Sequence, residues 1–237
     1  MFDLDDFLAQ MRPFHCGQCA YLAGEDETLM ALRCPNLPNL IHADLIERGY
    51  RHSGDIMYTA ACEKCSKCVP MRIDPHRFRP SKKQRHILNK NADVDIVITV
   101  PHLTDEIFDI YQRYMKFQHP DSPQECTRES LAKSTYCLLP SSAELQYRLD
   151  DRIIGITIAD IIPFRALSSV YHFFDPEFAH RSVGTFSMLA EICLTGHLDI
   201  PFFYPGLWVQ GCRKMEYKTN FRPYQLLIDG VWVDVEN

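Results

Sequence analysis

Residues 49–85 read GYRHSGDIMYTAACEKCSKCVPMRIDPHRFRPSKKQR, and no other stretch of the 237-residue chain holds as much chemistry. Cys62, Cys65 and Cys68 stand three residues apart, a spacing at which thiolates can converge on one centre where the backbone curls. Cys16 and Cys19, which we expect on a turn, are the nearest source of a fourth ligand. The pattern predicts zinc, an iron–sulfur cluster, or reduced thiols that merely pack a turn. Cysteine-only ligation serves both metals.

The end of the same stretch is basic. Lys82, Lys83 and Arg85 belong to residues 75–92, which contain no acidic residue. Ser81 is a suitable N-cap for a helix over residues 82–90 that presents these charges on one side. Such a run is often only a solvated helix face. In a chain with a net charge of −6, however, uncompensated cations favour contact with phosphates. We therefore expect residues 1–95 to form a cysteine-containing small domain that contacts nucleic acid.

Composition narrows the class of protein. Hydrophobic residues make up 46% of the chain and charged residues 24%, which are ordinary values for a globular protein. No apolar run is long enough to span a bilayer, and the first residues are acidic where a signal peptide is basic. These features predict a cytoplasmic protein. In that compartment, metal binding, catalysis or burial explains ten cysteines better than a disulfide framework does.

The pattern changes after Pro101. Residues 103–117 are helix-periodic, and residues 144–149, 153–162 and 169–174 read as consecutive antiparallel strands. A helix over residues 182–194 and two further strands follow. This order predicts an α/β or α+β domain with a mixed sheet over residues 96–237.

A short motif stands between a predicted strand and the helix that follows. Arg181, Gly184 and Thr185 belong to the sequence RSVGT, and a glycine at a helix N-terminus lets free N–H groups approach an anion or a carbonyl oxygen. The motif is similar to the R-x-x-G-x-G/A loop of GCN5-related N-acetyltransferases, except that Phe186 replaces the last small residue. The resemblance implies a GCN5-related N-acetyltransferase-like fold for this half.

Several motifs in one order resemble a known family. GYRHSGD, C-x2-C-x2-CVPMR and FRPSKKQRHILNKNAD in the first half, with YHFFDPEFAHRSVGT and GCRKMEYKTNFRP in the second, are similar to the bacterial aspartate/glutamate leucyltransferases. Arginyl-tRNA–protein transferases are their relatives. The likeness implies an enzyme that moves an aminoacyl group from charged tRNA to the N-terminal amine of proteins beginning with Asp or Glu. Such products enter N-end rule degradation.

The two departures from this family bear on the pockets. The Cys16–Cys19 pair is closer to the eukaryotic arginyltransferase pattern, so the donor amino acid is leucine or arginine. His52 and Pro205 stand where we expect an arginine and a leucine-glycine step. No cofactor is expected for the chemistry, because the aminoacyl ester is already activated.

The implied reaction assigns roles to candidate residues. We expect Arg181, Gly184 and Thr185 to cradle the acceptor end or the tetrahedral intermediate, and Tyr204 to lie in the core or line the cleft. Arg51 or Arg72 would bind the acidic N-terminal residue of the substrate, because a carboxylate needs a cationic partner.

The remaining assignments concern the tRNA and the proton. Lys214, Tyr217 and Lys218 would contact the terminal adenosine or its phosphate, beside the phosphate contacts of residues 82–85. Asp175 and Glu177 follow a strand, and the base is one of these acids, His172 or a water molecule.

Two other functions compete with this interpretation. One is an acyl-CoA-dependent N-acetyltransferase with an appended metal module, and Phe186 and the basic helix count against it. The other is a non-catalytic nucleic-acid-binding protein with a zinc ribbon, which would have no need of the RSVGT loop.

Overall fold

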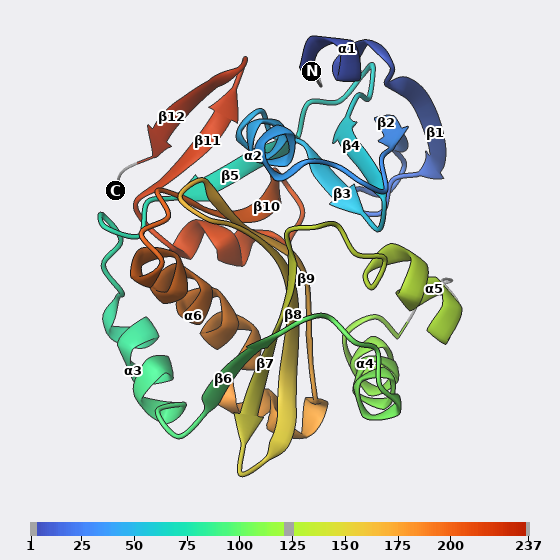
Figure 1. Cartoon of the computed structure of the whole chain (residues 1–237). Helices are drawn as coiled ribbons and strands as arrows, with labels where there is room; N and C mark the ends of the chain where they lie inside the picture. Colours follow the sequence, from blue (N-terminus) through green and yellow to red (C-terminus); the bar gives the residue numbers. More distant parts are fainter. Residues whose placement is uncertain (1–3, 121–125, 236–237) are drawn as a thin grey trace.

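The computed structural model of the protein describes residues 4–120 and 126–235, and two sheets organise it (Figure 1). The smaller sheet has four antiparallel strands in the order β1-β2-β4-β3. These strands are β1 (Arg12–Gln18), β2 (Asp26–Arg33), β3 (Arg51–Ser53) and β4 (Ile56–Ala60). Helices α1 (Leu4–Ala9) and α2 (Asn39–Glu47) pack beside it and share its core, to which Phe7, Leu45 and Met57 belong.

The larger sheet has eight strands in the order β12-β11-β5-β10-β9-β8-β7-β6. Every neighbouring pair in it is antiparallel except β9 and β10. In chain order the strands are β5 (Cys68–Ile73), β6 (Asp95–Thr99), β7 (Ser142–Leu149), β8 (Arg152–Ile162), β9 (Ala166–Phe174), β10 (Phe203–Val209), β11 (Tyr224–Ile228) and β12 (Val231–Val235).

Helices cover both faces of the larger sheet. Helix α6 (Val183–His197) and helix α3 (Lys82–Lys90) lie over one face, and α4 (Asp105–Gln118) and α5 (Arg128–Ser134) lie over the other (Figure 1). Each layer has its own hydrophobic core, because both faces of the central strands are apolar. Phe186 and Leu189 pack in the first core, and Ile107 and Phe173 pack in the second.

Local signals placed several helices correctly. Helix α3 begins at a capping box in which the Ser81 hydroxyl accepts from the Gln84 N–H and the Gln84 side chain accepts from the Ser81 N–H. Thr104 caps α4 through its side-chain oxygen, which accepts from the Ile107 N–H. The predicted antiparallel meander is confirmed as β7, β8 and β9. The prediction of a mixed sheet is confirmed as well.

Other predictions need correction or remain open. Cys16 lies within β1 and not on a turn, at an irregularity in the pairing between His15 and Gly17, both of which pair with β2. A division of the chain after residue 95 stays a prediction. Strand β5, which precedes that point, hydrogen-bonds to β10 and β11 of the larger sheet. Within the described residues, no helix is long and apolar enough to cross a membrane.

The parallel pair β9–β10 positions the site. The chain leaves β9, passes through the short 3-10 helix η1 (Pro176–Arg181) and α6, and returns as β10. The two strands pair only at Leu167 with Phe203 and at Ser168 with Tyr204. Beyond these pairs β9 is hydrogen-bonded to β8, whereas β10 is hydrogen-bonded to β5. The strands therefore diverge, and backbone groups on their facing edges need other partners.

Candidate functional site

Two cationic side chains supply partners where β9 and β10 diverge. Arg51, from β3, donates to the Ser168 hydroxyl over 3.0 Å and to the Ser169 carbonyl oxygen. Lys218, from the short 3-10 helix η2 (Glu216–Asn220), donates through Nζ to the carbonyl oxygens of Pro205 and Leu207, each over 2.8 Å. The gap between the strands is thus bridged by charged groups from distant parts of the chain.

A carboxylate lies beneath these cations. Glu191 comes from the middle of α6 and its exposed fraction is 0%. Neither carboxylate oxygen has a hydrogen-bond partner of normal geometry among the described residues. Burial raises the pKa of Glu191 to about 8, although the Ser169 hydroxyl and the cations of Arg51 and Lys218 oppose the rise. A carboxyl group of this kind can accept and release a proton near neutral pH.

The pKa of Lys218 is shifted in the opposite direction. Its side chain is only 7% exposed. Burial, followed by the like charge of Arg51, lowers the pKa of Lys218 to about 7, and Glu191 opposes this fall. We call Arg51, Glu191 and Lys218 the wedge cluster. Two oppositely shifted titratable groups in one buried place are typical of acid–base chemistry.

Sequence reasoning singled out Arg51 and Lys218 but missed Glu191. The run MLAEICL, residues 188–194, contained the signal, because one acid interrupts an otherwise apolar helix. An ionisable residue at such a position is either paired or perturbed when the helix is buried. The assignment of Lys218 to direct tRNA contact stays a prediction, and its ammonium group is engaged by two carbonyl oxygens.

Tyr204 and Arg72 lie close to the wedge cluster but serve the packing of β10. Tyr204 is 5% exposed, and its ring meets that of Trp232 at 5.9 Å. The Arg72 guanidinium lies 3.8 Å from the ring centre of Phe202 and donates to Gln225 over 2.6 Å. Of the two candidate arginines, Arg51 is the one that borders the divergence of the strands. Arg51 and Tyr204 also line one small hollow.

Arg181 lies just before α6, and Gly184 and Thr185 lie in its first turn. Arg181 forms a bidentate ion pair with Asp93, at 2.8 and 3.0 Å. The Thr185 N–H donates to the Ser182 carbonyl oxygen over 3.0 Å. A Cβ on Gly184 would meet only the Phe174 ring, at 4.0 Å, so this turn leaves open space.

Phe186 explains the departure from the glycine-rich loop pattern. Its side chain is 5% exposed, and its ring centre lies 5.8 Å from that of Tyr147. A small residue there would leave a cavity under the helix.

The basic helix α3 lies along α6 and joins both of these regions. Near its start, the Gln84 side chain donates to the Asn220 carbonyl oxygen in η2 over 3.1 Å. Just past its end, the Asn91 side chain donates to the Arg181 carbonyl oxygen over 3.0 Å. The helix therefore links the segment that carries Lys218 to the turn before Gly184.

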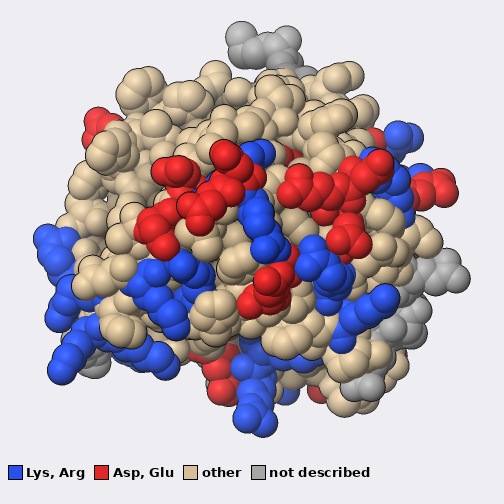
Figure 2. Space-filling view, turned by 90° about the horizontal axis from the view of Figure 1, so that it is seen from below, with Lys and Arg blue, Asp and Glu red and all other residues tan. Residues whose placement is uncertain are grey.

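The charged side chains of α3 point to solvent. Lys82, Lys83 and Arg85 are exposed, as are Lys214 and Tyr217 around η2. Figure 2, seen from below, shows Lys and Arg gathered at the left, on the side where Figure 1 places α3. Acidic residues gather toward the upper middle and right of the same view (Figure 2). The acidic chain thus has a local cationic face.

Asp175 and Glu177 follow the C-terminal end of β9, and both stabilise the structure around η1. Asp175 is 1% exposed, caps η1 through the Glu177 N–H and accepts from Arg113 over 2.7 Å. Glu177 pairs with Arg152 over 2.9 Å. These carboxylates have cationic partners of their own, in contrast to Glu191. Their predicted role in substrate binding stays a prediction.

The five predicted metal ligands gather at the edge of the smaller sheet. Burial, and then the neighbouring thiols of Cys19, Cys62 and Cys65, raises the pKa of Cys68 to about 12. Burial, Glu27 and Cys62 raise the pKa of Cys16. The structure therefore brings both cysteine motifs together. No three of these thiols, however, lie within 4.8 Å of one another.

Comparisons with known proteins agree over nearly the whole chain. A family model described as "Arginine-tRNA-protein transferase, N terminus" matches residues 17–86, and one described as "Arginine-tRNA-protein transferase, C terminus" matches residues 106–228. Proteins named aspartate/glutamate leucyltransferase from Pseudomonas fluorescens (strain ATCC BAA-477) and Pseudomonas savastanoi pv. phaseolicola are each 38% identical over 218 residues, which are 91% of this chain and 92% of the relative.

Solved structures are more distant. L-PGS from Bacillus licheniformis aligns with a TM-score of 0.48 at 10% identity, covering 82% of this chain and 62% of its own. That likeness carries no argument about function. Because the two family models match most of the chain and these relatives are 38% identical to it, the chain belongs to the arginine-tRNA-protein transferase family.

Proposed function

We propose that this protein is an aspartate/glutamate leucyltransferase, an enzyme that moves leucine from charged tRNA to the amino terminus of proteins beginning with Asp or Glu. The family models and the names of the 38% identical relatives support this function. The observation in the structure that carries it is the wedge cluster, a buried carboxyl with a pKa of about 8 that interacts with two cationic side chains. Aminolysis of an ester needs such a proton acceptor near an amine.

The larger sheet would serve as a GCN5-related acyltransferase scaffold. A parallel strand pair that diverges after two residue pairs, joined through α6, supports this proposal. In open sheets with crossover helices, ligands bind where neighbouring strands separate. The aminoacyl ester would enter there, and Gly184 with its open surroundings would face the approaching acceptor end.

The cationic face of α3 would hold the tRNA backbone. Lys82, Lys83 and Arg85 are exposed and carry no ion pair within 4.0 Å to a described carboxylate. Phosphates would satisfy them and release condensed counterions. Because α3 touches both η2 and the turn at Arg181, a tRNA held on it would place its acceptor end along α6.

Arg51 would bind the acidic side chain of the protein substrate. Its guanidinium directs one NH group to Ser168 and another to the Ser169 carbonyl, and its planar fork keeps further N–H groups for a carboxylate. Glu191 would take the proton from the substrate ammonium. The free amine then attacks the ester carbon to form a tetrahedral intermediate. As its C–O bond to the tRNA breaks, Glu191 gives its proton to the leaving oxygen, takes the second proton from the nitrogen that becomes the amide, and releases that proton to solvent.

The cysteines would bind a thiolate-preferring metal, zinc or an iron–sulfur cluster. Their donor type fits such a metal. Sulfur atoms that share one zinc ion at about 2.3 Å lie closer together than the thiols do here. Binding would therefore require the loop from Cys62 to Cys68 to tighten. No step of the transfer depends on this metal.

A transfer assay with three donors tests the function. The purified protein is given tRNA charged with labelled leucine, tRNA charged with labelled arginine, or labelled acetyl-CoA. The acceptor is a peptide beginning with Asp, and a matched peptide beginning with Ala is the control. We expect label from leucine on the Asp peptide alone. Transfer from arginyl-tRNA would change the donor, and acetyl transfer without aminoacyl transfer would replace the function by that of an N-acetyltransferase.

A further inference from the structure

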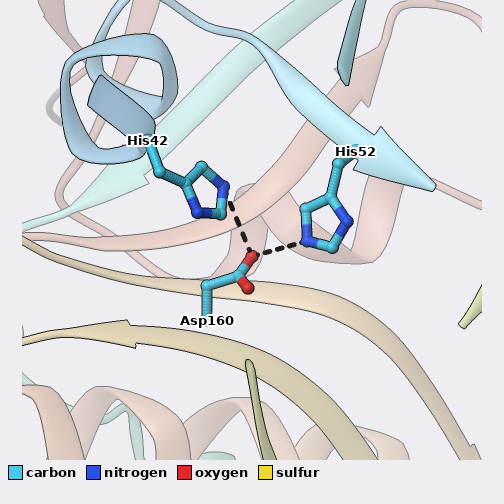
Figure 3. A group of neighbouring side chains, drawn as sticks. All are labelled: His42, His52 and Asp160. Carbon is cyan, nitrogen blue, oxygen red and sulfur yellow. Dashed lines mark hydrogen bonds and ion pairs between the residues drawn. The ribbon is translucent and has the colours of Figure 1, made fainter. Parts of the chain in front are cut away.

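Two histidines and an aspartate converge at the junction of the two sheets. His42 comes from α2, His52 from β3 and Asp160 from β8, so three elements far apart in the sequence meet at this point (Figure 3). Their exposed fractions are 1%, 8% and 1%. Their ligand atoms all lie within 4.8 Å of one another. This cluster takes no part in the proposed transfer.

Hydrogen bonds fix the tautomer of each ring. His52 Nδ1 lies 2.8 Å from the Gly54 carbonyl oxygen, which can only accept, so Nδ1 carries a proton. The Ser141 hydroxyl gives its single proton to Asp160 Oδ1 over 3.1 Å and so must accept from His42 Nδ1 over 2.9 Å. Both Nδ1 atoms are therefore donors.

The two Nε2 atoms consequently turn toward one carboxylate oxygen. His52 Nε2 lies 2.8 Å from Asp160 Oδ2, and His42 Nε2 lies 3.7 Å from the same atom (Figure 3). In neutral rings with protonated Nδ1, both Nε2 atoms present lone pairs to an oxygen that also presents lone pairs. Three electron-rich atoms gathered without water need a positive charge between them.

The distances suit a divalent cation. Nitrogen and oxygen ligands bind zinc at about 2.0–2.1 Å, and tetrahedral geometry then places them about 3.4 Å apart. The observed separations of 2.8 and 3.7 Å lie on either side of that value. Metal-bound histidines also usually donate their other N–H to a carbonyl or a polar side chain. Here His52 donates to the Gly54 carbonyl oxygen and His42 donates to the Ser141 hydroxyl.

We propose that His42 Nε2, His52 Nε2 and Asp160 Oδ2 bind one divalent transition-metal ion of the zinc type. The ion would lock α2 and β3 to β8. His52 adjoins Arg51, and Asp160 pairs in register with Ser168, the residue that receives the Arg51 guanidinium. The site would therefore hold the strand that positions Arg51. The metal site does not depend on the proposed function. The alternative source of a positive charge between the three atoms is a proton on His52 Nε2.

X-ray absorption at the zinc edge of the intact protein tests the proposal without relying on any variant. The protein is dialysed against chelator, supplied with an excess of zinc that can fill both this site and the cysteines, and desalted. We expect a first shell that contains nitrogen and oxygen at about 2.0–2.1 Å, beside any sulfur shell from the cysteines. A shell made only of sulfur, at about 2.3 Å, would assign the metal to the cysteines and overturn the proposal.

Two variants localise the ion. Asp160→Asn keeps the size of the side chain but removes its charge, and His52→Gln removes one ligand. Each should lose the nitrogen and oxygen shell, while His197→Gln, an exposed histidine at the end of α6, retains it. Wild-type protein that keeps native circular dichroism yet shows no nitrogen and oxygen shell would overturn the metal site and leave the proton as the bridge.

Discussion

The strongest test of the wedge cluster is the substitution Glu191→Gln, because it keeps the shape of the side chain and removes its titration. The pKa of Glu191 is raised from 4.5 to about 8 by burial. Between these two values the folded protein binds more protons than the unfolded protein. The free energy of unfolding should therefore fall as the pH rises from about 4.5 to about 8.

The size of the effect follows from the shift. The difference of 8 minus 4.5, at about 1.4 kcal/mol per pKa unit, gives about 5 kcal/mol across the window. This figure is an upper value, because Arg51 and Lys218 can relax around a charged Glu191. Lys218 acts in the opposite sense, in a window that overlaps this one only between about pH 7 and 8. Its pKa is lowered from 10.5 to about 7, so its contribution to the free energy of unfolding rises with pH above about 7.

Urea unfolding followed by circular dichroism at pH 5.5, 7 and 8.5 measures the effect. The difference between wild type and Glu191→Gln cancels the titrating groups that do not interact with Glu191, whereas Lys218, whose pKa Glu191 influences, contributes to the difference above about pH 7. We expect the wild type to lose a few kcal/mol relative to the variant between pH 5.5 and 8.5. Glu216→Gln, an exposed glutamate in η2, is the matched control and should follow the wild type. Parallel curves for wild type and Glu191→Gln would refute the buried, proton-holding carboxyl.

Catalysis supplies a second readout for the same variant. If Glu191 accepts the ammonium proton, Glu191→Gln should lower leucine transfer by about 10²-fold or more while tRNA binding is kept. The deficit should shrink above about pH 8, where the free amine of the substrate becomes abundant without a base. A deficit that stays constant with pH would assign Glu191 to structure and not to proton transfer.

Three further predictions address the remaining parts of the protein. Changing Lys82, Lys83 and Arg85 together to Ala should weaken tRNA binding and reduce the slope of log K against log salt by about 2 to 3, whereas an unchanged slope would remove their phosphate role. The control set, exposed cations of α4 and α5, is Lys116, Arg128 and Lys133. Arg51→Lys should raise KM for an Asp-starting peptide about tenfold with little change in kcat, because lysine cannot form the planar bidentate contact, and a change in kcat alone would contradict this role. Cys65→Ser should remove sulfur-bound zinc or the visible iron–sulfur band from anaerobically purified protein. A metal-free wild type that is folded and active would reduce the cysteines to packing.

Local chemistry in the sequence was enough to place many elements. The Ser81 cap and its basic helix were predicted in the right place, and the Thr104 cap of α4 and the turn at Asp229 and Gly230 depend on local signals of the same kind. Each of these depends on side-chain to backbone contacts or φ preferences within a few residues, and both are visible in sequence order. The family motifs can likewise be recognised directly in the sequence.

The candidate site was decided by tertiary structure. Arg51, Glu191 and Lys218 are separated by well over a hundred residues at the extremes, and they meet only because β9 and β10 pair at two positions and then part. Strand β5, which the local pattern gave no reason to place in the second sheet, inserts between β10 and β11. Periodicity reports which face of an element is apolar, but strand partners and the burial of one carboxylate depend on long-range pairing. The sequence alone thus determined the family and the local elements, whereas the shifted pKa values and the histidine–aspartate cluster arise from contacts that only the folded chain creates.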